Sequence, residues 1–552
     1  MLLKEEIAKV VSGEVEESGE KIQEYSRDTS IFEVKPSLVV CPEDVGDVEK
    51  LVAWVSEGNQ GNWGNQGGQG SKLSLTARAA GTDMTGGPLT DSILVSFTEH
   101  LNHISEIGND YVIVEPGVYF RDLEKELLAK GLWYPPYPAS KDMCAVGGIV
   151  NNDSGGEKTL RFGKTHSYVL GMWMVMADGQ EHFVEKLTPV QLEEKMAQKD
   201  FEGEIYQKTY DLLDKNRDLL AKTHPTVTKN SSGYNVWGVL DEYFDLTQLL
   251  TGAQGTLGIM TKVKLRLLPK EKFDKLFVVF INDLKQLPEF TSEVMALSPT
   301  SLEITDDNTF KIYLRYAREM ASVLGANGVF EFFKLFFPDG MMILQGGIPK
   351  IILLAEFEGN VEEVEEGKIR AMEKIVKKYH MRGRYAKEKM DAAKYWKLRR
   401  DTFKLLREKV KEVYPTPFID DLEVHVKDMP DFWPKLRAML DAAKIMYTIS
   451  GHLGDGNLHI IPLMNIKDPK EREKIWDLTP KIYDLVLSYR GSISAEHNDG
   501  LIRSPYLQHE FGDQLYELFS EIKKIFDPQG IFNPHKKTDA TTKWSREHVR
   551  TA

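Results

Sequence analysis

The stretch Arg78-Ala79-Ala80-Gly81-Thr82-Asp83-Met84-Thr85-Gly86-Gly87-Pro88 follows a short apolar segment, residues 73–77, whose pattern predicts a strand. Small residues, glycines and hydroxyls directly after a strand suit a loop whose backbone N–H groups close around phosphate oxygens. The glycine spacing matches neither G-x-x-x-x-G-K-[ST] nor G-x-G-x-x-G, so the stretch indicates neither a P-loop nor a Rossmann site. An ordinary glycine-rich turn stays open as the alternative.

Two more stretches of small residues lie beside apolar strands, at residues 135–156 and 251–260. Three such loops favour a long ligand, such as a dinucleotide, held between a sheet and the loops. Spacing alone does not exclude a glycine-rich α/β domain without a ligand.

A histidine-rich stretch, Gly451-His452-Leu453-Gly454-Asp455-Gly456-Asn457-Leu458-His459, predicts a tight turn. A helix is disfavoured because each glycine in its interior costs about 1 kcal/mol. Residues 458–461 then read as a buried strand, so the two histidines can converge on one point. Glu496-His497 offers a third metal ligand, and a polar hairpin with structural histidines is the alternative.

The overall composition limits the function classes. A chain of 552 residues is too long for one core, so two or three domains are expected. The net charge of −14 argues against nucleic acid as a partner. The two cysteines, Cys41 and Cys144, form no disulfide framework and no C-x-x-C motif. With no apolar signal core and no apolar run of 18 residues, we expect a cytoplasmic protein.

The N-terminal region has three further features. Residues 4–25 predict a surface helix, and residues 45–55 predict a second helix by their period. Residues 58–70 consist of Gly, Asn and Gln apart from Trp63, which predicts a flexible insertion.

An ordered series of motifs resembles the FAD-linked oxidase family, whose flavin domain is of the vanillyl-alcohol oxidase type. The resemblance covers roughly residues 25–537. It rests on residues 78–87, 114–118, 135–156, 161–165, 177–179, 229–234, 255–259, 451–459, 496–497 and 526–534. Within the family, the histidine motif and Asn151-Asn152-Asp153-Ser154-Gly155-Gly156 look most like the D-2-hydroxyacid dehydrogenases of the D-lactate and glycolate group.

The resemblance implies an α+β fold. It predicts an FAD-binding domain of two α+β subdomains over residues 32–270 and a substrate domain with a helix-covered antiparallel sheet over residues 271–500. A helical segment (1–31) would precede them, a segment capping the flavin (501–537) would follow, and residues 538–552 would form a flexible tail.

The resemblance also implies the cofactor site. FAD would be contacted by Arg78, Ala79, Ala80, Gly81, Thr82, Asp83, Thr85, Gly86, Pro138, Ser140, Val146, Gly147, Gly148, Asn151, Asn152, Ser154, Gly155, Gln254, Gly258, Ile259 and Asn533. Family members that attach flavin covalently use a histidine in the first loop. None stands in residues 78–87, so non-covalent FAD is expected.

In the resembled family, a divalent metal is bound at positions that correspond to His452, His459 and Glu496. Zinc suits imidazole and carboxylate ligands, with manganese or iron as alternatives. His497 would act as general base while hydride passes from the α-carbon of a 2-hydroxy acid to the flavin. Arg399 best matches the arginine that pairs with the substrate carboxylate, and a solvated basic helix face is its alternative.

Two departures predict the substrate. Relatives that use a dicarboxylate carry Asn and Lys where this chain has Ile461 and Ile419. Because isoleucine would leave a distal carboxylate unpaired, a monocarboxylate such as D-lactate or glycolate is predicted.

Other partners stay open. The sequence does not identify the electron acceptor: a quinone, a cytochrome, an electron-transfer flavoprotein and O2 are the candidates. The apolar residues 329–345 suggest peripheral membrane contact at the inner face, or equally core packing; a homodimer is a further alternative. Rival functions are an aryl-alcohol oxidase, an alkyl-glycerone-phosphate synthase and a non-catalytic flavin-binding subunit.

Overall fold

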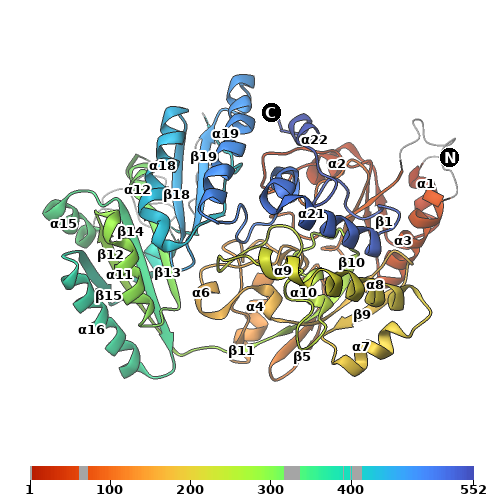
Figure 1. Ribbon diagram of the computed structural model, residues 1–552, viewed down its shortest axis with the longest axis horizontal. Helices are drawn as coiled ribbons and strands as arrows, with labels where there is room; N and C mark the ends of the chain where they lie inside the picture. The colour runs from red at the N-terminus through yellow and green to blue at the C-terminus, as the bar shows by residue number, and fades with distance from the viewer. Residues whose placement is uncertain are drawn as a thin grey trace.

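The computed structural model has two halves, with the early and the last residues in one and the middle of the chain in the other (Figure 1). It describes residues 3–60, 72–315, 336–388, 391–397, 399–400 and 413–551. Part of the predicted insertion at 58–70 and part of the apolar stretch at 329–345 lie outside these residues. No helix in the described ranges is long and apolar enough to cross a membrane.

The first sheet follows from short apolar segments near the N-terminus. Its strands, in order across the sheet, are β1 (Glu14–Glu16), β2 (Leu38–Cys41), β4 (Ile93–Ser96) and β3 (Leu75–Arg78). β4 pairs in parallel with both β2 and β3. Helix α3 (Val45–Gln60) packs its apolar stripe, Val48, Leu51, Val52 and Val55, into the same core, as its period predicts.

The second sheet is antiparallel and completes the first half. In order across the sheet, its strands are β5 (Ile104–Ile107), β6 (Tyr111–Val114), β10 (Ile259–Arg266), β8 (Val169–Val175) and β9 (Glu181–Glu185). The helices of this half are α4 (Phe120–Ala129), α5 (Val146–Asn151), α6 (Thr159–Phe162), α7 (Pro189–Met196), α8 (Phe201–Lys215), α9 (Arg217–Thr223) and α10 (Leu246–Leu250). The short pair β7 (Leu132–Trp133) and β11 (Leu268–Pro269) lies at the passage to the second half.

An eight-stranded antiparallel sheet forms the second half. Its strands are β15 (Arg382–Ala386), β12 (Phe273–Ile281), β14 (Ile351–Gly359), β13 (Ser301–Asp306), β18 (Met446–His452), β19 (Asn457–Met464) and β16 (Tyr414–Pro415), with β17 (Leu422–Glu423) also on β19. The described helices of this half are α11 (Leu287–Met295), α12 (Asp307–Arg315), α15 (Phe337–Gly346), α16 (Glu362–Lys378), α18 (Met429–Ala442) and α19 (Pro469–Ser488).

Strand β12 shows why helices cover this sheet on both faces. Phe277 and Val279 enter one apolar core, whereas Leu276 and Val278 enter another on the opposite face. Alternate residues of a strand point to opposite faces, so a continuous apolar run requires cover on both. The predicted α+β class with a helix-covered antiparallel sheet is confirmed.

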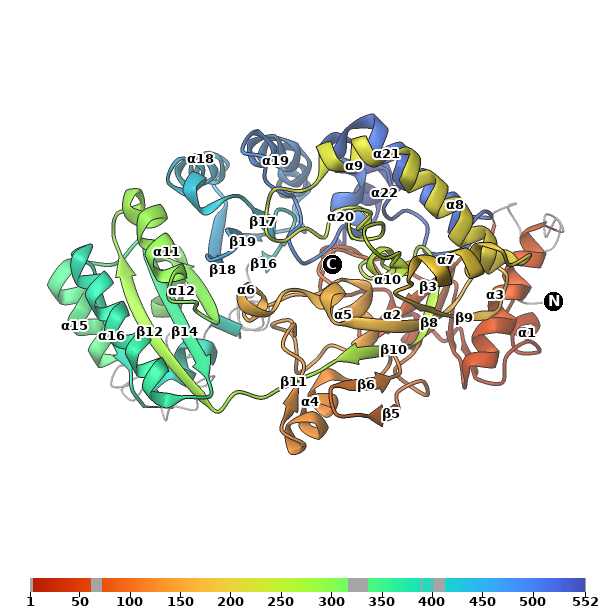
Figure 2. The same cartoon turned by 60° about the horizontal axis from the view of Figure 1, so that its bottom comes forward.

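The C-terminal segment returns to the first half, where α21 (Leu507–Phe526) lies beside α8 and α9 (Figure 2). Short α20 (Gly500–Arg503) precedes it. Asn533 then donates to the carbonyl oxygens of Gly87 and Gln254, at 3.0 and 2.6 Å. The segment therefore joins two of the glycine-rich loops. The domain boundaries given above remain predictions.

The helix predicted for residues 4–25, and with it the helical segment 1–31, is wrong. Helices α1 (Leu3–Ile7) and α2 (Gly19–Tyr25) flank strand β1, in which buried Val15 pairs with Val40. A Cβ atom on Gly13 would lie 2.0 Å from the Cys41 carbonyl oxygen, so glycine allows this close approach.

The tail at residues 538–552 was predicted to be flexible, but its described part, residues 538–551, packs against the first half. Helix α22 (Thr542–Glu547) is capped at its N-terminus by Thr541, whose hydroxyl accepts the Trp544 N–H. Buried Val549 bridges to Phe32, so this segment is held by backbone pairing and apolar contact.

Candidate functional site

The histidine motif forms the hairpin that was predicted. His452 ends β18, His459 lies in β19, and Ser450 pairs with His459 in the ladder. Gly456 has φ +87 in the turn, a conformation that favours glycine. Both imidazoles are buried and face the same side of the hairpin, with ring centroids 5.1 Å apart.

The two imidazoles converge on one carboxylate oxygen. Nε2 of His452 lies 3.0 Å from Glu496 Oε1, and Nε2 of His459 lies 3.2 Å from the same atom. Glu496 belongs to a loop after α19, so the structure brings together three predicted ligands that are 44 residues apart at the extremes.

Glu303 holds the other side of His452. Its Oε1 lies 2.5 Å from His452 Nδ1, and its Oε2 lies 3.1 Å from Arg399 Nε. Burial by itself lowers the pKa of His452, but the carboxylates of Glu303 and Glu496 together outweigh it and raise that pKa to about 9. A carboxylate on Nδ1 fixes the imidazole with Nε2 toward Glu496.

Asp420 lies between the other two imidazoles. Its Oδ2 lies 2.8 Å from His497 Nδ1, and its Oδ1 lies 3.3 Å from His459 Nδ1. Burial opposes a charged His497, but the carboxylates of Asp421 and Asp420 raise its pKa to about 9. A positive charge held at Glu496 would favour the neutral imidazole that a general base requires.

Asp421 and Lys229 complete the buried charges. Asp421 Oδ2 accepts the backbone N–H groups of Glu496 and His497, at 2.8 and 2.7 Å. Lys229 Nζ contacts Glu496 Oε2 at 3.3 Å and Asp455 Oδ2 at 3.1 Å. One oxygen of Glu496 thus faces a lysine, and the other faces the histidines.

The donor set suits a divalent cation. Two imidazole nitrogens and a carboxylate oxygen converge, and the Glu303 carboxylate holds the outward nitrogen of His452, as is usual around metal-bound histidines. Asp421, His459, Glu496 and His497 also bring one candidate ligand atom each within 4.8 Å of one another. Because Asp421 Oδ2 already accepts two N–H groups, we assign it to holding the loop.

Sequence reasoning did not find Glu303, Asp420, Asp421 or Lys229 as site residues. Glu303 is in β13, and the register of the ladder β13–β18 places it opposite His452, 149 residues further along the chain. Two signals were present: the Asp-Asp pair beside Ile419 and the lysine that opens the motif at residues 229–234.

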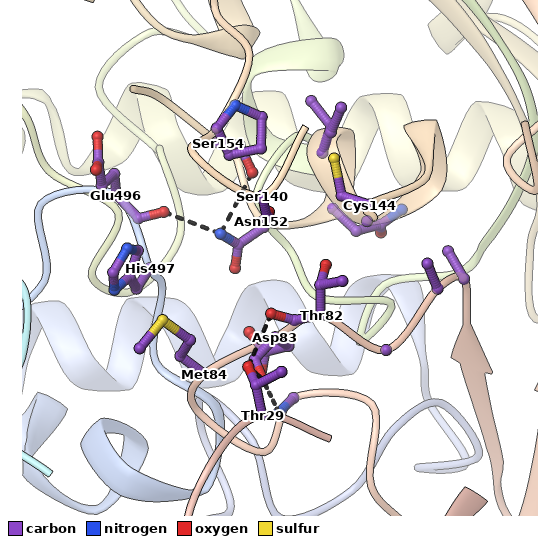
Figure 3. A pocket seen from close by; sticks show the side chains of 18 of the residues that line it. Thr29, Thr82, Asp83, Met84, Ser140, Cys144, Asn152, Ser154, Glu496 and His497 are labelled. Carbon is purple, nitrogen blue, oxygen red and sulfur yellow. Dashed lines mark hydrogen bonds between the residues drawn. The ribbon is translucent and has the colours of Figure 1, made fainter. Parts of the chain in front are cut away.

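The glycine-rich loops and the histidine hairpin line one cavity. Figure 3 shows Glu496 and His497 on one side of it, with Asn152 donating to the Glu496 carbonyl oxygen at 2.9 Å. The predicted FAD residues that line it are Arg78, Ala79, Ala80, Gly81, Thr82, Asp83, Pro138, Ser140, Gly147, Gly148, Asn151, Asn152, Ser154, Gly155, Gln254 and Gly258.

The remaining predicted FAD residues do not line this cavity. Thr85 is buried and donates to Asp83, while Val146 and Ile259 pack into apolar cores. Gly86 packs against Phe32 and Leu501, and Asn533 ties the loops together. These five residues support the loops.

The cavity fits a flat ligand. Gly148 lines it, and no atom lies within 4 Å of the place where its Cβ would stand. Helix α5 therefore presents bare backbone to the cavity, so a ring system could approach closely. The loop residues on this wall would hold FAD.

The wall near the hairpin decides what fits beside the flavin. Arg399, which was predicted to pair with the substrate carboxylate, and Arg400 both line this wall. Arg400 is paired with Glu157. Ile461 also lines it and packs with Ile312 and Leu463. Ile419, which was expected to face the substrate, is instead fully buried in the core of the second half and does not line the cavity.

Two known protein families match this chain, one in each half. The family described as "FAD binding domain" matches residues 36–184. The family described as "FAD linked oxidases, C-terminal domain" matches residues 270–537. The first match supports the predicted FAD cofactor.

The similar curated proteins are oxidoreductases by name. A D-2-hydroxyglutarate dehydrogenase of Pseudomonas putida is 26% identical over 92% of this chain and 49% of that protein. A glycolate oxidase subunit GlcD of Bacillus subtilis is 25% identical over 93% of this chain and 91% of that protein. The chain spans about half the length of the first of these relatives.

Solved structures share the fold. A 4-ethylphenol oxidase of Gulosibacter chungangensis matches with a TM-score of 0.67 at 15% identity, over 98% of this chain and 97% of that one. An alkyldihydroxyacetonephosphate synthase matches with a TM-score of 0.66 at 14% identity, over 96% and 86%. Two family models, one of an FAD-binding domain and one of the C-terminal domain of FAD-linked oxidases, together match residues 36–184 and 270–537, and this chain therefore belongs to the FAD-linked oxidases.

Proposed function

We propose that the chain is an FAD-dependent dehydrogenase that oxidises a D-2-hydroxy monocarboxylic acid to the 2-oxo acid. One observation carries the proposal: the FAD-type loops and the His452–His459–Glu496 cluster line the same cavity. Bound FAD supplies a hydride acceptor, and a bound divalent cation, zinc in our proposal, supplies a Lewis acid beside it.

Three groups of this chain have roles in the proposal. His452, His459 and Glu496 hold the cation through Nε2, Nε2 and Oε1. Arg399 lines the cavity with its Nε on Glu303, and its guanidinium binds the substrate carboxylate. His497, which is 23% exposed at its side chain, accepts the hydroxyl proton.

A single carboxylate is proposed because of Ile461. Among the described residues, its side chain and the apolar cluster around it offer a second carboxylate no charged partner, and Arg400 on the same wall is already paired with Glu157. The D-2-hydroxyglutarate dehydrogenases among the relatives favour the opposite choice, a dicarboxylate. Steady-state rates with D-lactate, glycolate and D-2-hydroxyglutarate decide: equal or better turnover of D-2-hydroxyglutarate rules out the monocarboxylate proposal.

The reaction itself is tested on the flavin. We expect D-lactate to bleach the visible flavin band of the purified protein under anaerobic conditions, and prior chelation to abolish the bleaching. Bleaching that chelation leaves unchanged would reject the metal and keep the flavin reaction. No bleaching by any 2-hydroxy acid would favour an aryl-alcohol oxidase, an alkyl-glycerone-phosphate synthase or a non-catalytic subunit.

Non-covalent FAD is part of the proposal. Residues 78–87 contain no histidine, and Cys144 in the cavity wall is 3% exposed, with its pKa raised to about 12 by burial. Acid precipitation should release all flavin into the supernatant, and flavin fluorescence in the washed pellet would contradict this. We leave a quinone, a cytochrome and an electron-transfer flavoprotein as candidate acceptors.

A further inference from the structure

A short segment outside the three glycine-rich loops, residues 25–33, lies against the first of them. Thr29 in this segment lines the cavity. Its backbone N–H donates to the Asp83 carbonyl oxygen at 3.0 Å, and its hydroxyl lies 2.7 Å from the same oxygen and 3.0 Å from that of Thr82 (Figure 3). The loop is thus held through its own backbone by a residue that sequence reasoning did not find.

The contact with Thr29 leaves N–H groups of the loop free. In a planar trans peptide the N–H points opposite to the C=O, so the N–H groups of Asp83 and Met84 are turned away from Thr29. Among the residues that the structure describes, neither N–H donates to an acceptor. Successive free N–H groups in a loop bind phosphate oxygens. Thr29 therefore favours the backbone orientation in which the first loop can bind the pyrophosphate of FAD.

Arg78, the first residue of the loop, contacts the segment at two more points. Its Nη1 and Nη2 donate to the carbonyl oxygens of Tyr25 and Arg27, at 3.1 and 2.8 Å. At the other end of the segment, Phe32 is fully buried and packs on Gly86, where a Cβ atom would lie 2.9 Å from its ring. The segment therefore follows the loop from its arginine to its glycine pair.

The C-terminal tail pairs with the same segment. Two backbone hydrogen bonds, of 2.8 and 3.0 Å, join residues 31–33 to residues 548–550. Between them Phe32 and Val549 form an antiparallel bridge, and Val549 is 6% exposed. The position of Phe32 on the loop is therefore tied to the docking of the tail.

The tail also reaches the loop by a second route. The hydroxyl of Ser545 in α22 donates to the Leu501 carbonyl oxygen at 2.6 Å. The Leu501 N–H in turn donates to the Thr85 carbonyl oxygen at 2.8 Å. One tail thus holds two segments that both contact the first glycine-rich loop.

We propose that Thr29 is a residue of the cofactor site and that the C-terminal clasp, residues 541–551, sets how tightly the protein holds FAD. The clasp holds residues 31–33, and the segment to which they belong places Thr29 and Phe32 on the loop. Because coupling between two sites is reciprocal, bound FAD should also stabilise the docked clasp. The inference rests on the FAD part of the proposed function and is independent of the proposed substrate and metal.

The first test is Val549→Asp, which places a charge in the apolar contact with Phe32 and should undock the clasp. We expect the holoenzyme to release FAD about 5- to 150-fold faster, the usual range of coupling between two sites. The fluorescence of the freed flavin measures the rate. Release at the wild-type rate would overturn the proposal.

Val11→Asp is the matched control. Val11 is also 6% exposed, but it belongs to the core of the first sheet, whereas Val549 belongs to a different core. This variant should lose stability and still release FAD within about twofold of the wild-type rate, because separate sites act independently. Equal acceleration in the two variants would reduce the effect of Val549 to general destabilisation and overturn the clasp.

Thr29 is tested by a pair of substitutions. Thr29→Val removes the hydroxyl and keeps the shape, so FAD release should accelerate about 2- to 10-fold, as on loss of one hydrogen bond. Thr29→Ser keeps the hydroxyl and should release FAD at close to the wild-type rate. Equal rates in all three proteins would remove Thr29 from the cofactor site.

The last test uses the wild-type protein and needs no turnover. The amides of Glu33 and Arg550 form the two backbone bonds to the clasp, with His548 and Ile31 as acceptors. Their hydrogen exchange should be slower in the holoenzyme than after FAD release, by a factor similar to that of Val549→Asp, because opening the clasp then also weakens FAD binding. Exchange that FAD leaves unchanged would overturn the clasp even if Val549→Asp fails to fold. If no 2-hydroxy acid reduces the flavin, the proposed substrate fails, while this result still decides the clasp.

Discussion

Arg399 lines the cavity beside the histidine hairpin. Its Nε donates to Glu303 Oε2 at 3.1 Å. We expect Arg399→Met to raise KM for D-lactate about 10- to 100-fold, the loss of one charged hydrogen-bonded contact. Arg399→Lys should recover part of this, since an ammonium keeps the charge without the fork. Unchanged KM in the Met variant would contradict the assigned role.

His182 gives stability a pH dependence. A hydrogen bond to Asp178 and the Glu202 carboxylate 3.8 Å away, both in the first half, raise the pKa of His182 to about 9. Because the pKa of His182 is higher in the folded state, protonation of His182 stabilises the fold. This stabilisation is fully present below the unfolded-state pKa of 6.5 and is lost as the pH rises through about 9. His182→Gln should therefore cost about 1.5 kcal/mol at pH 6, in the range for charged hydrogen bonds, and almost nothing at pH 9.5. Denaturant unfolding at both pH values checks this; equal losses would contradict it.

At the scale of elements, the hairpin β18–β19 depends on Gly456. A Cβ there would lie 1.9 Å from the Val424 carbonyl oxygen, and the backbone has φ +87. Gly456→Ala should destabilise the fold by more than about 2 kcal/mol and weaken zinc binding, because the turn sets the separation of His452 and His459.

Gly340 in α15 supplies the control. No atom lies within 4 Å of its Cβ position, and it sits in an α-helix. Gly340→Ala should stabilise the protein by about 0.5–1 kcal/mol and leave zinc binding unchanged. A Gly456→Ala variant that binds zinc as tightly as Gly340→Ala would show that the turn does not set the site.

At the scale of the whole molecule, Lys158 connects the two halves. It precedes α6 in the first half, and its Nζ contacts Glu356 and, at 3.3 Å, Glu358, both in β14 of the second half. All three side chains are buried. Lys158→Met should cost about 3–5 kcal/mol, as for a broken buried ion pair, and should separate the thermal unfolding of the two halves in calorimetry.

Lys208 is the matched surface lysine. It pairs with Glu204 one helical turn away, and both side chains are more than half exposed. Lys208→Met should change stability by less than about 0.5 kcal/mol. A single unchanged transition in Lys158→Met would mean that the buried pair does not hold the halves together.

The sequence by itself determined the features that are local. The turn at residues 453–456, the buried strand after it, the helix at 45–55 and the antiparallel class of the second half follow from glycines, apolar period and motif order. The helix expected at 4–25 failed because pairing with β2 outweighed the helical pattern.

Only the tertiary structure decided which distant groups meet. Glu303, Asp420 and Lys229 lie far from the histidines in sequence, and they reach them through ladder register and the closing of the two halves over one cavity. Ile419, next to Asp420, points into the core instead. Neighbours along the chain can face opposite ways, so contact with substrate is set by packing across elements, which no local pattern specifies.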